Sequence, residues 1–381
     1  MPKRDTRITF ILLAVLILSL FLSILNNSGT NSYNELKKCN NTERHIRMFC
    51  YKNFIKSKLE NENTNIKDLI PNSFPYIRYN SLSEVTSLYQ NSHGTNTHTF
   101  LHMAGDVFAK KYVNNLSEGL LLCDGCVGYQ MAVLIRMAYF YNYDELKVNQ
   151  LIESCLKIVS YKIECTHAAG HIFFDKFVFN TLKLFDDFQE GKLYRLNEPS
   201  MVNLSSAFSA CENLSEGAPV CNIGVAHNIF HLIHYTDDQW ENGITWCNQI
   251  RNDEYKQTCL ESFALISGGN EAGLELIKGN TNQAISFCID LFSKSGENVT
   301  KECFKGIGIE IADVIASLNV DDFKLLKDDF SYLASLCKKI GKYSGYCYNG
   351  MNDYIARHKR HKHPNILVLI EFEKYLPKQY T

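Results

Sequence analysis

The chain has 381 residues, of which 45% are hydrophobic and 21% are charged, an ordinary balance for a globular protein with a sizeable core. Its formal net charge of −2 gives no overall field that would attract nucleic acid, so we expect no nucleic-acid partner. The unusual feature is cysteine. Fourteen cysteines are spread along the chain in close pairs, which favours a disulfide-bonded protein of an oxidising compartment and argues against a cysteine nucleophile.

The first predicted element is a membrane anchor over residues 8–25. This run carries no charged residue, and it follows a short segment, 1–7, that contains Lys3, Arg4 and Arg7. The positive-inside rule then places residues 1–7 in the cytoplasm and the bulk of the chain in a lumen or outside the cell, as a type II single-pass membrane protein. A cleaved signal peptide is the alternative, and it also exports the rest of the chain.

Residues 26–95 are polar and rich in Asn and Ser, and we interpret them as a stalk or an N-terminal cap. The sequence also predicts a glycoprotein, because N-x-S/T acceptor sites recur along it. These sites are Asn26, Asn40, Asn115, Asn203, Asn213 and Asn298.

Residues 96–355 show helical spacing of apolar side chains and contain only two prolines, Pro199 and Pro219, which predicts an all-α region. The cysteine pairs recur here at intervals near 40 residues, about the length of a helical hairpin in a stacked array. The expected fold is therefore an array of disulfide-stapled helical hairpins, an α-solenoid or an α/α toroid-like ring, behind the N-terminal anchor.

Each cysteine pair is expected to join the end of one helix to the start of the next. The predicted pairs are Cys39/Cys50, Cys123/Cys126, Cys155/Cys165, Cys211/Cys221, Cys247/Cys259, Cys288/Cys303 and Cys337/Cys347. The Cys123/Cys126 spacing also suits a metal or redox site, or a bond to another cysteine. A small residue stands three positions after the second cysteine of five pairs, which predicts close helix crossings. These residues are Ala168, Gly224, Ser262, Gly306 and Gly350.

Residues 356–381 form a basic C-terminal tail, with four Lys or Arg and three His between positions 357 and 363. The run is typical of a solvated helix end. The alternative is a patch for anionic glycans or lipid headgroups.

A histidine pattern carries the strongest hint of chemistry. Three H-x3-H pairs occur, and residues four apart share one face of a helix. Two of the pairs continue to an aspartate at the same step. The stripe is in register with the cysteines, and later repeats carry Asp313 and Arg357 at equivalent positions. Stacked repeats would bring these faces together, so we predict a metal centre. The candidate ligands are His98, His102, Asp106, His167, His171, Asp175, His227, His231 and His234.

Neutral imidazole is the commonest metal ligand, and His/carboxylate sites suit a divalent zinc, iron or manganese ion. One helix cannot place all three of its stripe residues on a single ion, so the pattern implies either two ions or that some of these residues orient a ligating imidazole without touching the ion. Bis-histidine haem ligation is a further possibility, although the chain has no C-x-x-C-H motif. The alternative is that these histidines only form hydrogen bonds between packed helices.

The sequence therefore predicts a membrane-anchored, exported helical-repeat protein with a histidine/aspartate metal centre, which could serve a metal-dependent enzyme. The rival hypothesis is a non-enzymatic scaffold or receptor-like protein with structural histidines and a protein or glycan partner. A third is a pH sensor, since clustered histidines titrate near pH 6. Neither an HExxH zinc motif nor a P-loop occurs in the chain.

Overall fold

The structure is a computed structural model of the chain. It describes residues 33–40, 44–60, 66–79, 81–88, 96–123, 126, 128–159, 162–179, 204–214, 217–236, 240–318, 327–360 and 366–380. The predicted membrane anchor at 8–25 lies outside these ranges. Within them, no helix combines the length and the apolar character needed to cross a bilayer.

The described part of the chain is helical, as predicted, and its one β feature is an isolated bridge between Tyr79 and Leu318. The first half contains α2 (Arg44–Glu60), α3 (Ile66–Ile77), α4 (Leu82–Leu88), α5 (Asn96–Lys111), α6 (Leu116–Leu121), α7 (Tyr129–Phe140), α8 (Glu145–Ile158), α9 (Lys162–Phe174) and the π-helical turn η2 (Asp175–Phe179). The second half contains α12 (Leu204–Glu212), α13 (Ala218–Thr236), α14 (Trp240–Asn248), α15 (Asp253–Phe263), the π-helical turn η5 (Ala264–Gly268), α16 (Gly269–Ile277), α17 (Thr281–Phe292), α18 (Glu297–Ala316), α19 (Lys327–Lys339), α20 (Ser344–Arg360) and α21 (Ile366–Glu373). Short 3-10 turns are η6 (Ser293–Ser295), η7 (Gly341–Tyr343) and η8 (Lys378–Tyr380).

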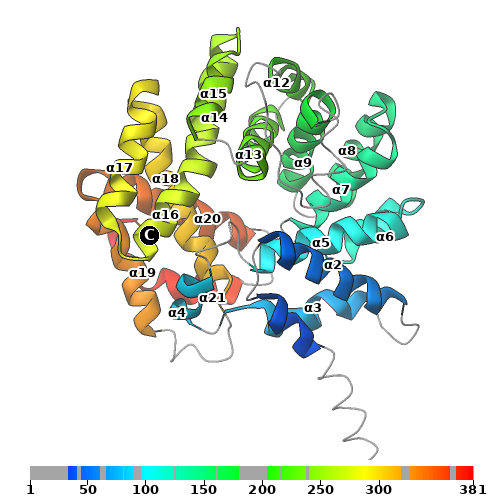
Figure 1. Ribbon diagram of the computed structural model, residues 1–381, viewed down its shortest axis with the longest axis horizontal. Helices are drawn as coiled ribbons and strands as arrows, with labels where there is room; N and C mark the ends of the chain where they lie inside the picture. Colours follow the sequence, from blue (N-terminus) through cyan, green and yellow to red (C-terminus); the bar gives the residue numbers. More distant parts are fainter. Residues whose placement is uncertain are drawn as a thin grey trace, which may run out of the picture.

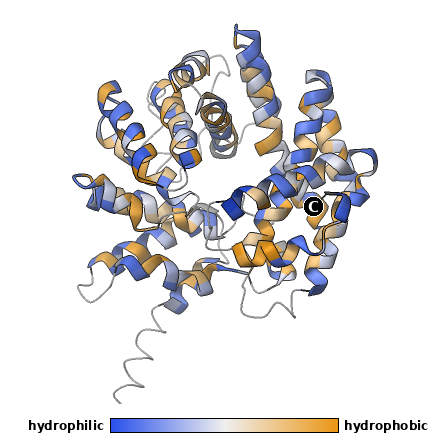
Figure 2. Cartoon of the chain, turned by 180° about the vertical axis from the view of Figure 1, so that it is seen from behind, coloured by the Kyte–Doolittle hydropathy of each residue, from blue (hydrophilic) through white to orange (hydrophobic). Residues whose placement is uncertain are grey.

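The helices are arranged in a ring, which Figure 1 shows from α2 and α3 through α9 and α13 to α18 and α20. A series of helices packs one beside the next around this arrangement, in the order α5, α7, α9, α13, α15 with α16, α18 and α20. Most helices carry both apolar and polar residues along their length (Figure 2), which is the pattern expected of helices that bury one face.

The two ends of this array meet. The backbone N–H of Tyr79, which follows α3, donates to the carbonyl oxygen of Ser317 at the end of α18, at 3.1 Å. The N–H of Leu82 donates to the Asp329 carboxylate of α19 at 2.9 Å. His98 of α5 and Arg357 of α20 line one common cavity. Of the two predicted architectures, the arrangement is therefore closer to the α/α toroid than to an open solenoid.

All seven predicted cysteine pairs are disulfides, including Cys123–Cys126, and no cysteine of the chain is free. In the repeats the bridge joins the last turns of one helix to the helix after it. For example, Cys155 lies in α8 and Cys165 in α9, and Cys211 lies in α12 and Cys221 in α13. The bridges link the two helices of each hairpin at their connected ends, so the second helix of each hairpin begins at a fixed place.

Close helix crossings occur at the predicted small residues. A Cβ on Gly224 of α13 would collide with the backbone carbonyl of His167 on α9, and a Cβ on Gly350 of α20 would collide with that of Lys305 on α18. Both glycines stand three residues after the second cysteine of their repeat, and both meet the carbonyl two residues after the previous repeat's cysteine. The two crossings therefore share one geometry, which confirms that these repeats are structurally equivalent.

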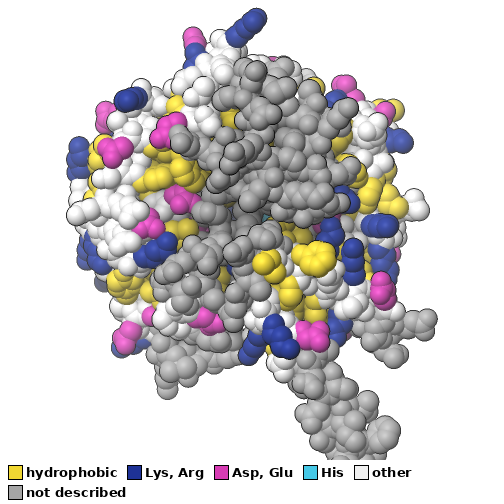
Figure 3. All heavy atoms as spheres, in the orientation of Figure 1, with side chains coloured by type: hydrophobic (Ala, Val, Ile, Leu, Met, Phe, Trp, Pro, Cys, Tyr) yellow, Lys and Arg dark blue, Asp and Glu magenta, His cyan; other side chains and the backbone are white. Residues whose placement is uncertain are grey.

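The predicted glycan acceptors are not all on the surface. Asn115, Asn213 and Asn298 are exposed, whereas Asn40 is buried and its side-chain amide donates to the Tyr76 carbonyl at 3.0 Å. Asn26 and Asn203 lie outside the described residues. In the face shown in Figure 3, charges of both signs are scattered around the rim, with no large patch of one sign.

The basic run near the C-terminus is partly ordered as helix. Helix α20 continues to Arg360, and His358 within it is buried, with Nδ1 donating to the Tyr354 carbonyl at 2.8 Å. Residues 361–365 lie outside the described ranges. Helix α21 then packs Val368, Leu369 and Phe372 against α18 and α20.

Candidate metal centre

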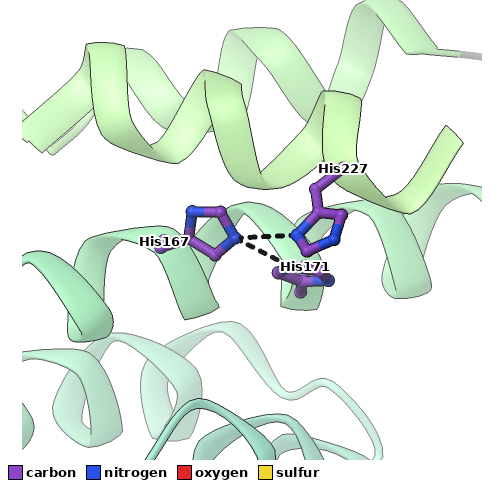
Figure 4. Close-up of side chains that lie close together, drawn as sticks. All are labelled: His167, His171 and His227. Carbon is purple, nitrogen blue, oxygen red and sulfur yellow. Dashed lines mark hydrogen bonds between the residues drawn. The ribbon is translucent and has the colours of Figure 1, made fainter. Parts of the chain in front are cut away.

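Three of the predicted ligands converge at the crossing of α9 and α13. His167 and His171 lie one turn apart on α9, and His227 faces them from α13 (Figure 4). Nε2 of His167 lies 3.0 Å from Nε2 of His171 and 3.2 Å from Nδ1 of His227. One ring nitrogen from each residue falls within 4.8 Å of the other two, and among the described residues this is the group that could hold a metal ion.

Glycine at the crossing makes this convergence possible. Gly170 of α9 and Gly224 of α13 lie against each other and against the opposite backbone, where a Cβ on either would collide. Two helix axes normally lie about 8–10 Å apart, and small residues at the contact allow the close end of that range. The imidazoles on both sides of the crossing can then reach across the short gap.

Asn228 fixes the tautomer of His171. Its amide nitrogen donates to the His171 backbone carbonyl at 3.3 Å, and a carbonyl oxygen can only accept, so the other amide atom is the oxygen. That oxygen lies 2.6 Å from Nδ1 of His171, which must therefore be the donor. A neutral imidazole with its proton on Nδ1 has a lone pair on Nε2. The lone pair of His171 consequently points into the group of three.

Asp175 extends the hydrogen bonds that begin at His171 and pass through Asn228. The same amide nitrogen of Asn228 donates to the Asp175 carboxylate at 3.2 Å, and both Asp175 and Asn228 are buried. Asp175 therefore reaches His171 through Asn228 rather than by direct contact with the three nitrogens. Of the roles that the sequence left open for this residue, the geometry matches that of an orienting partner.

The electrostatics of the group favour neutral rings. Burial lowers the pKa of His171 to about 4, and the hydrogen bond that His171 donates to Asn228 opposes this shift. Burial, together with the neighbouring imidazoles, lowers the pKa values of His167 and His227 well below the ordinary histidine range. Neutral imidazoles are the form that binds a metal ion. Burial also raises the pKa of Asp175 well above its ordinary value.

The other predicted ligands surround this group without joining it. His231 stacks on His227 with ring centroids 4.7 Å apart, and His98 and His102 form a second pair at 4.5 Å. Asp106 instead forms ion pairs with Lys52 at 2.8 Å and with Arg136 at 3.1 Å. His234 lies in α13, but its side chain is outside the described part of the structure.

Two hollows flank the three imidazoles. The larger, about 250 Å³, is lined by His98, His167, His227 and His231 from α5, α9 and α13, and by Glu310, Asp313, Tyr354 and Arg357 from α18 and α20. The smaller, about 90 Å³, lies beside His102, His171, His231, Asp106 and Asp175. By volume the smaller one fits about three water molecules. Four helical repeats thus contribute polar groups to one interior space, as the shared stripe predicted.

Two features of the larger cavity were missed by the histidine pattern. Glu164 lines it from α9, where it is only 6% exposed and accepts the Gly128 backbone N–H at 3.4 Å. Burial raises the pKa of Glu164 to about 7, partly offset by that N–H and by Arg357. In the same cavity the Tyr354 hydroxyl of α20 donates to Asp313 of α18 at 2.6 Å, and burial raises the pKa of this carboxyl. The signals for Glu164 in the sequence are its place directly before Cys165 and its position three residues before His167, which puts it one turn away on the same side of the helix.

Two of the three distances between the nitrogens match a tetrahedral ion. Nitrogens bound at about 2.0–2.1 Å to tetrahedral zinc lie about 3.3 Å from one another, close to the 3.0 and 3.2 Å that separate His167 Nε2 from the other two nitrogens. The third pair lies within 4.8 Å. In the arrangement shown, the Nε2 proton of His167 faces the His171 lone pair and the Nδ1 atom of His227 together. If His167 instead carried its proton on Nδ1, its Nε2 lone pair would join those of His171 and His227, and a cation at this place would meet three lone pairs of neutral rings.

No family model, curated protein or solved structure matches this chain. The site is therefore interpreted from its own geometry.

Proposed function

We propose that the protein is an exported metalloprotein in which His167, His171 and His227 together hold one divalent ion. The observation that carries the proposal is the convergence of three neutral imidazole nitrogens at a helix crossing, with one ring fixed by Asn228. Three histidines with an open fourth position are the ligand set of catalytic zinc sites. Zinc is the best fit, because the group contains no carboxylate of the kind that iron and manganese sites favour.

The charge of the adjoining cavity supports a cation. Glu164, Glu310 and Asp313 line it against a single guanidinium, that of Arg357. When all of these groups are ionised, the wall carries an excess of two negative charges, which a divalent ion would balance. Attraction to a nearby cation offsets the desolvation cost of such buried carboxylates.

The seven disulfides and the basic-then-apolar N-terminus support export to an oxidising compartment. We propose that residues 8–25 anchor the chain in a membrane, with the helical ring on the lumenal or extracellular side. Expression of the full chain with a tag at either end, followed by protease protection of sealed vesicles, tests this orientation.

Metal binding is tested by thermal unfolding of the disulfide-intact protein after EDTA treatment and dialysis. A ligand that binds only the folded state raises its stability in proportion to ln(1 + [L]/Kd). We expect zinc to raise Tm at micromolar concentration, iron and manganese to do so only at higher concentration, and magnesium to have no effect. Equal responses to zinc and magnesium would refute the site.

A further inference from the structure

Glu164 and the proposed ligand His167 both lie on α9 and both line the larger cavity. Glu164 lies three residues before His167 on α9, and side chains at this spacing are neighbours about 5–6 Å apart at Cβ. The cavity is lined by both residues. The fourth position of a tetrahedral ion held by the three imidazoles is open, since no fourth described His, Cys, Asp or Glu belongs to the group.

The surroundings of Glu164 leave its carboxyl group unusually little hydrogen bonding for a buried acid. Among the described residues, one backbone N–H reaches it, that of Gly128 at the start of α7. Gly128 has φ 89°, and a Cβ there would lie 3.1–3.4 Å from the rings of His102 and His98. The glycine thus lets the start of α7 pack against the His98/His102 pair and brings its N–H to the carboxylate.

We propose that Glu164 accepts a proton from a water molecule bound at the fourth position of the ion, and that the cavity hydrolyses a small, uncharged ester or amide. This inference rests on the proposed metal site. In the reaction, one proton of the water passes to the Glu164 carboxylate, and the water oxygen forms a bond to the carbonyl carbon. The bond from that carbon to the leaving oxygen or nitrogen then breaks, and Glu164 returns the proton to the leaving atom. One water is consumed and no electron is transferred.

The substrate class follows from charge and size. The charges of the three ionised carboxylates, the Arg357 guanidinium and the divalent ion sum to zero. A charged substrate would therefore lack a counter-charge in the cavity. A volume of about 250 Å³ lies just below the range of most ligand pockets, which limits the substrate to a small molecule. Arg357 of α20 also lines the cavity. It is a cation to which no described residue forms an ion pair, and it can stabilise the negative charge that develops on the carbonyl oxygen.

The test uses the zinc-loaded disulfide-intact protein and 4-nitrophenyl acetate as the probe ester, with release of 4-nitrophenol as the signal. Glu164→Gln keeps the size of the side chain and removes the proton acceptor. We expect it to retain one zinc per chain and to lower kcat by at least 100-fold with little change in KM, the range for loss of a general base. Glu164→Asp is expected to recover part of the rate.

Glu302 supplies a matched control. It stands directly before Cys303, as Glu164 stands before Cys165, but it does not line the cavity. Glu302→Gln should leave both the zinc content and the rate of hydrolysis unchanged. Two results would overturn the inference while leaving the metal site intact: a zinc-loaded wild type no faster than the EDTA-treated protein, or a Glu164→Gln variant as fast as wild type. Failure of the wild type to bind zinc would instead refute the proposed function.

Discussion

The Nδ1 atom of His171 donates a hydrogen bond to the Asn228 side-chain oxygen at 2.6 Å, and this contact determines which ring nitrogen of the imidazole carries the lone pair. The bond crosses from α9 to α13, directly beside the crossing at Gly170 and Gly224. It therefore links the packing of two repeats to the chemistry of the site. Without it, the ring could protonate on Nε2 and would no longer present a lone pair to His167 and His227.

Asn228→Ala should accordingly weaken metal binding without removing any ligand. Loss of a residue that orients a ligating histidine typically costs 10–100-fold in affinity, and we expect a loss in that range for zinc. Competition with a chromogenic chelator measures it. Asn222→Ala, on the same helix but outside both cavities, is the control and should bind zinc as wild type does. Equal affinities for the two variants would contradict the role of Asn228.

The crossing glycines separate stability from metal binding. Gly224→Ala and Gly350→Ala each add a Cβ that collides with a carbonyl of the neighbouring helix. Both should lower the free energy of unfolding by about 1–3 kcal/mol, the usual cost of overpacking. Only Gly224 lies at the crossing that brings His227 to His167 and His171. Zinc affinity should therefore fall in Gly224→Ala and stay unchanged in Gly350→Ala, and parallel losses in both variants would contradict this geometry.

The hairpin bridges should contribute to stability without taking part in the site. Cys337 and Cys347 join α19 to α20 across a short loop. Replacing both with alanine should lower the free energy of unfolding by about 2–3 kcal/mol, the value expected from loop entropy. Urea denaturation measures this loss. The same variant should bind zinc with wild-type affinity, because its bridge belongs to a repeat that supplies no imidazole to the group; a large loss of affinity would be inconsistent with that assignment.

The lowered pKa of His171 predicts a pH-dependent contribution to stability in the metal-free protein. Below pH 6.5 the unfolded state binds a proton at this residue and the folded state does not, down to the folded pKa of about 4. The contribution is thus fully present above pH 6.5 and is lost as the pH falls toward 4. It amounts to about 3 kcal/mol, since each unit of pKa shift corresponds to about 1.4 kcal/mol.

Comparison with His171→Gln isolates this effect from the buried carboxyl groups of Glu164 and Asp175, whose raised pKa values act in the opposite direction. The difference in unfolding free energy between wild type and variant should grow as the pH rises from 4 to 6.5 and then remain constant. Urea titrations at half-unit pH steps measure it. A difference independent of pH would show that the ring is not held neutral by burial.

Much of the fold could be predicted from the cysteines. The spacing predicted their pairing, the hairpins and the small residues at the crossings, because a helix period and a short loop limit which residues can meet; for Cys123 and Cys126 it left a metal site, a redox site or another partner open. The spacing also identified His167, His171 and His227, since residues four apart share a face and the repeats stack in register. Asp313 and Arg357, in the equivalent faces of later repeats, do line the same cavity.

The rest depended on contacts between elements that are distant in sequence. Asp106 has the same spacing from His102 as Asp175 has from His171, yet it pairs with Lys52 of α2 and Arg136 of α7, and neither partner belongs to the stripe. Asn228 lies beside His227 in the sequence, and its role arises from the crossing of α9 with α13. Glu164 is one turn before His167, but its hydrogen bond with Gly128 depends on the approach of α7, which no single helix pattern encodes.

The most direct test of the metal centre is elemental analysis of the exported chain, purified without chelators and compared with three single-ligand variants and one control variant. The account predicts about one zinc per chain in wild type and in His358→Ala, a buried histidine of α20 that lies outside the group. It predicts less than a tenth of that in His167→Ala, His171→Ala and His227→Ala, with helical content unchanged by circular dichroism. A wild-type protein that is folded, disulfide-bonded and free of metal even after incubation with zinc would contradict it.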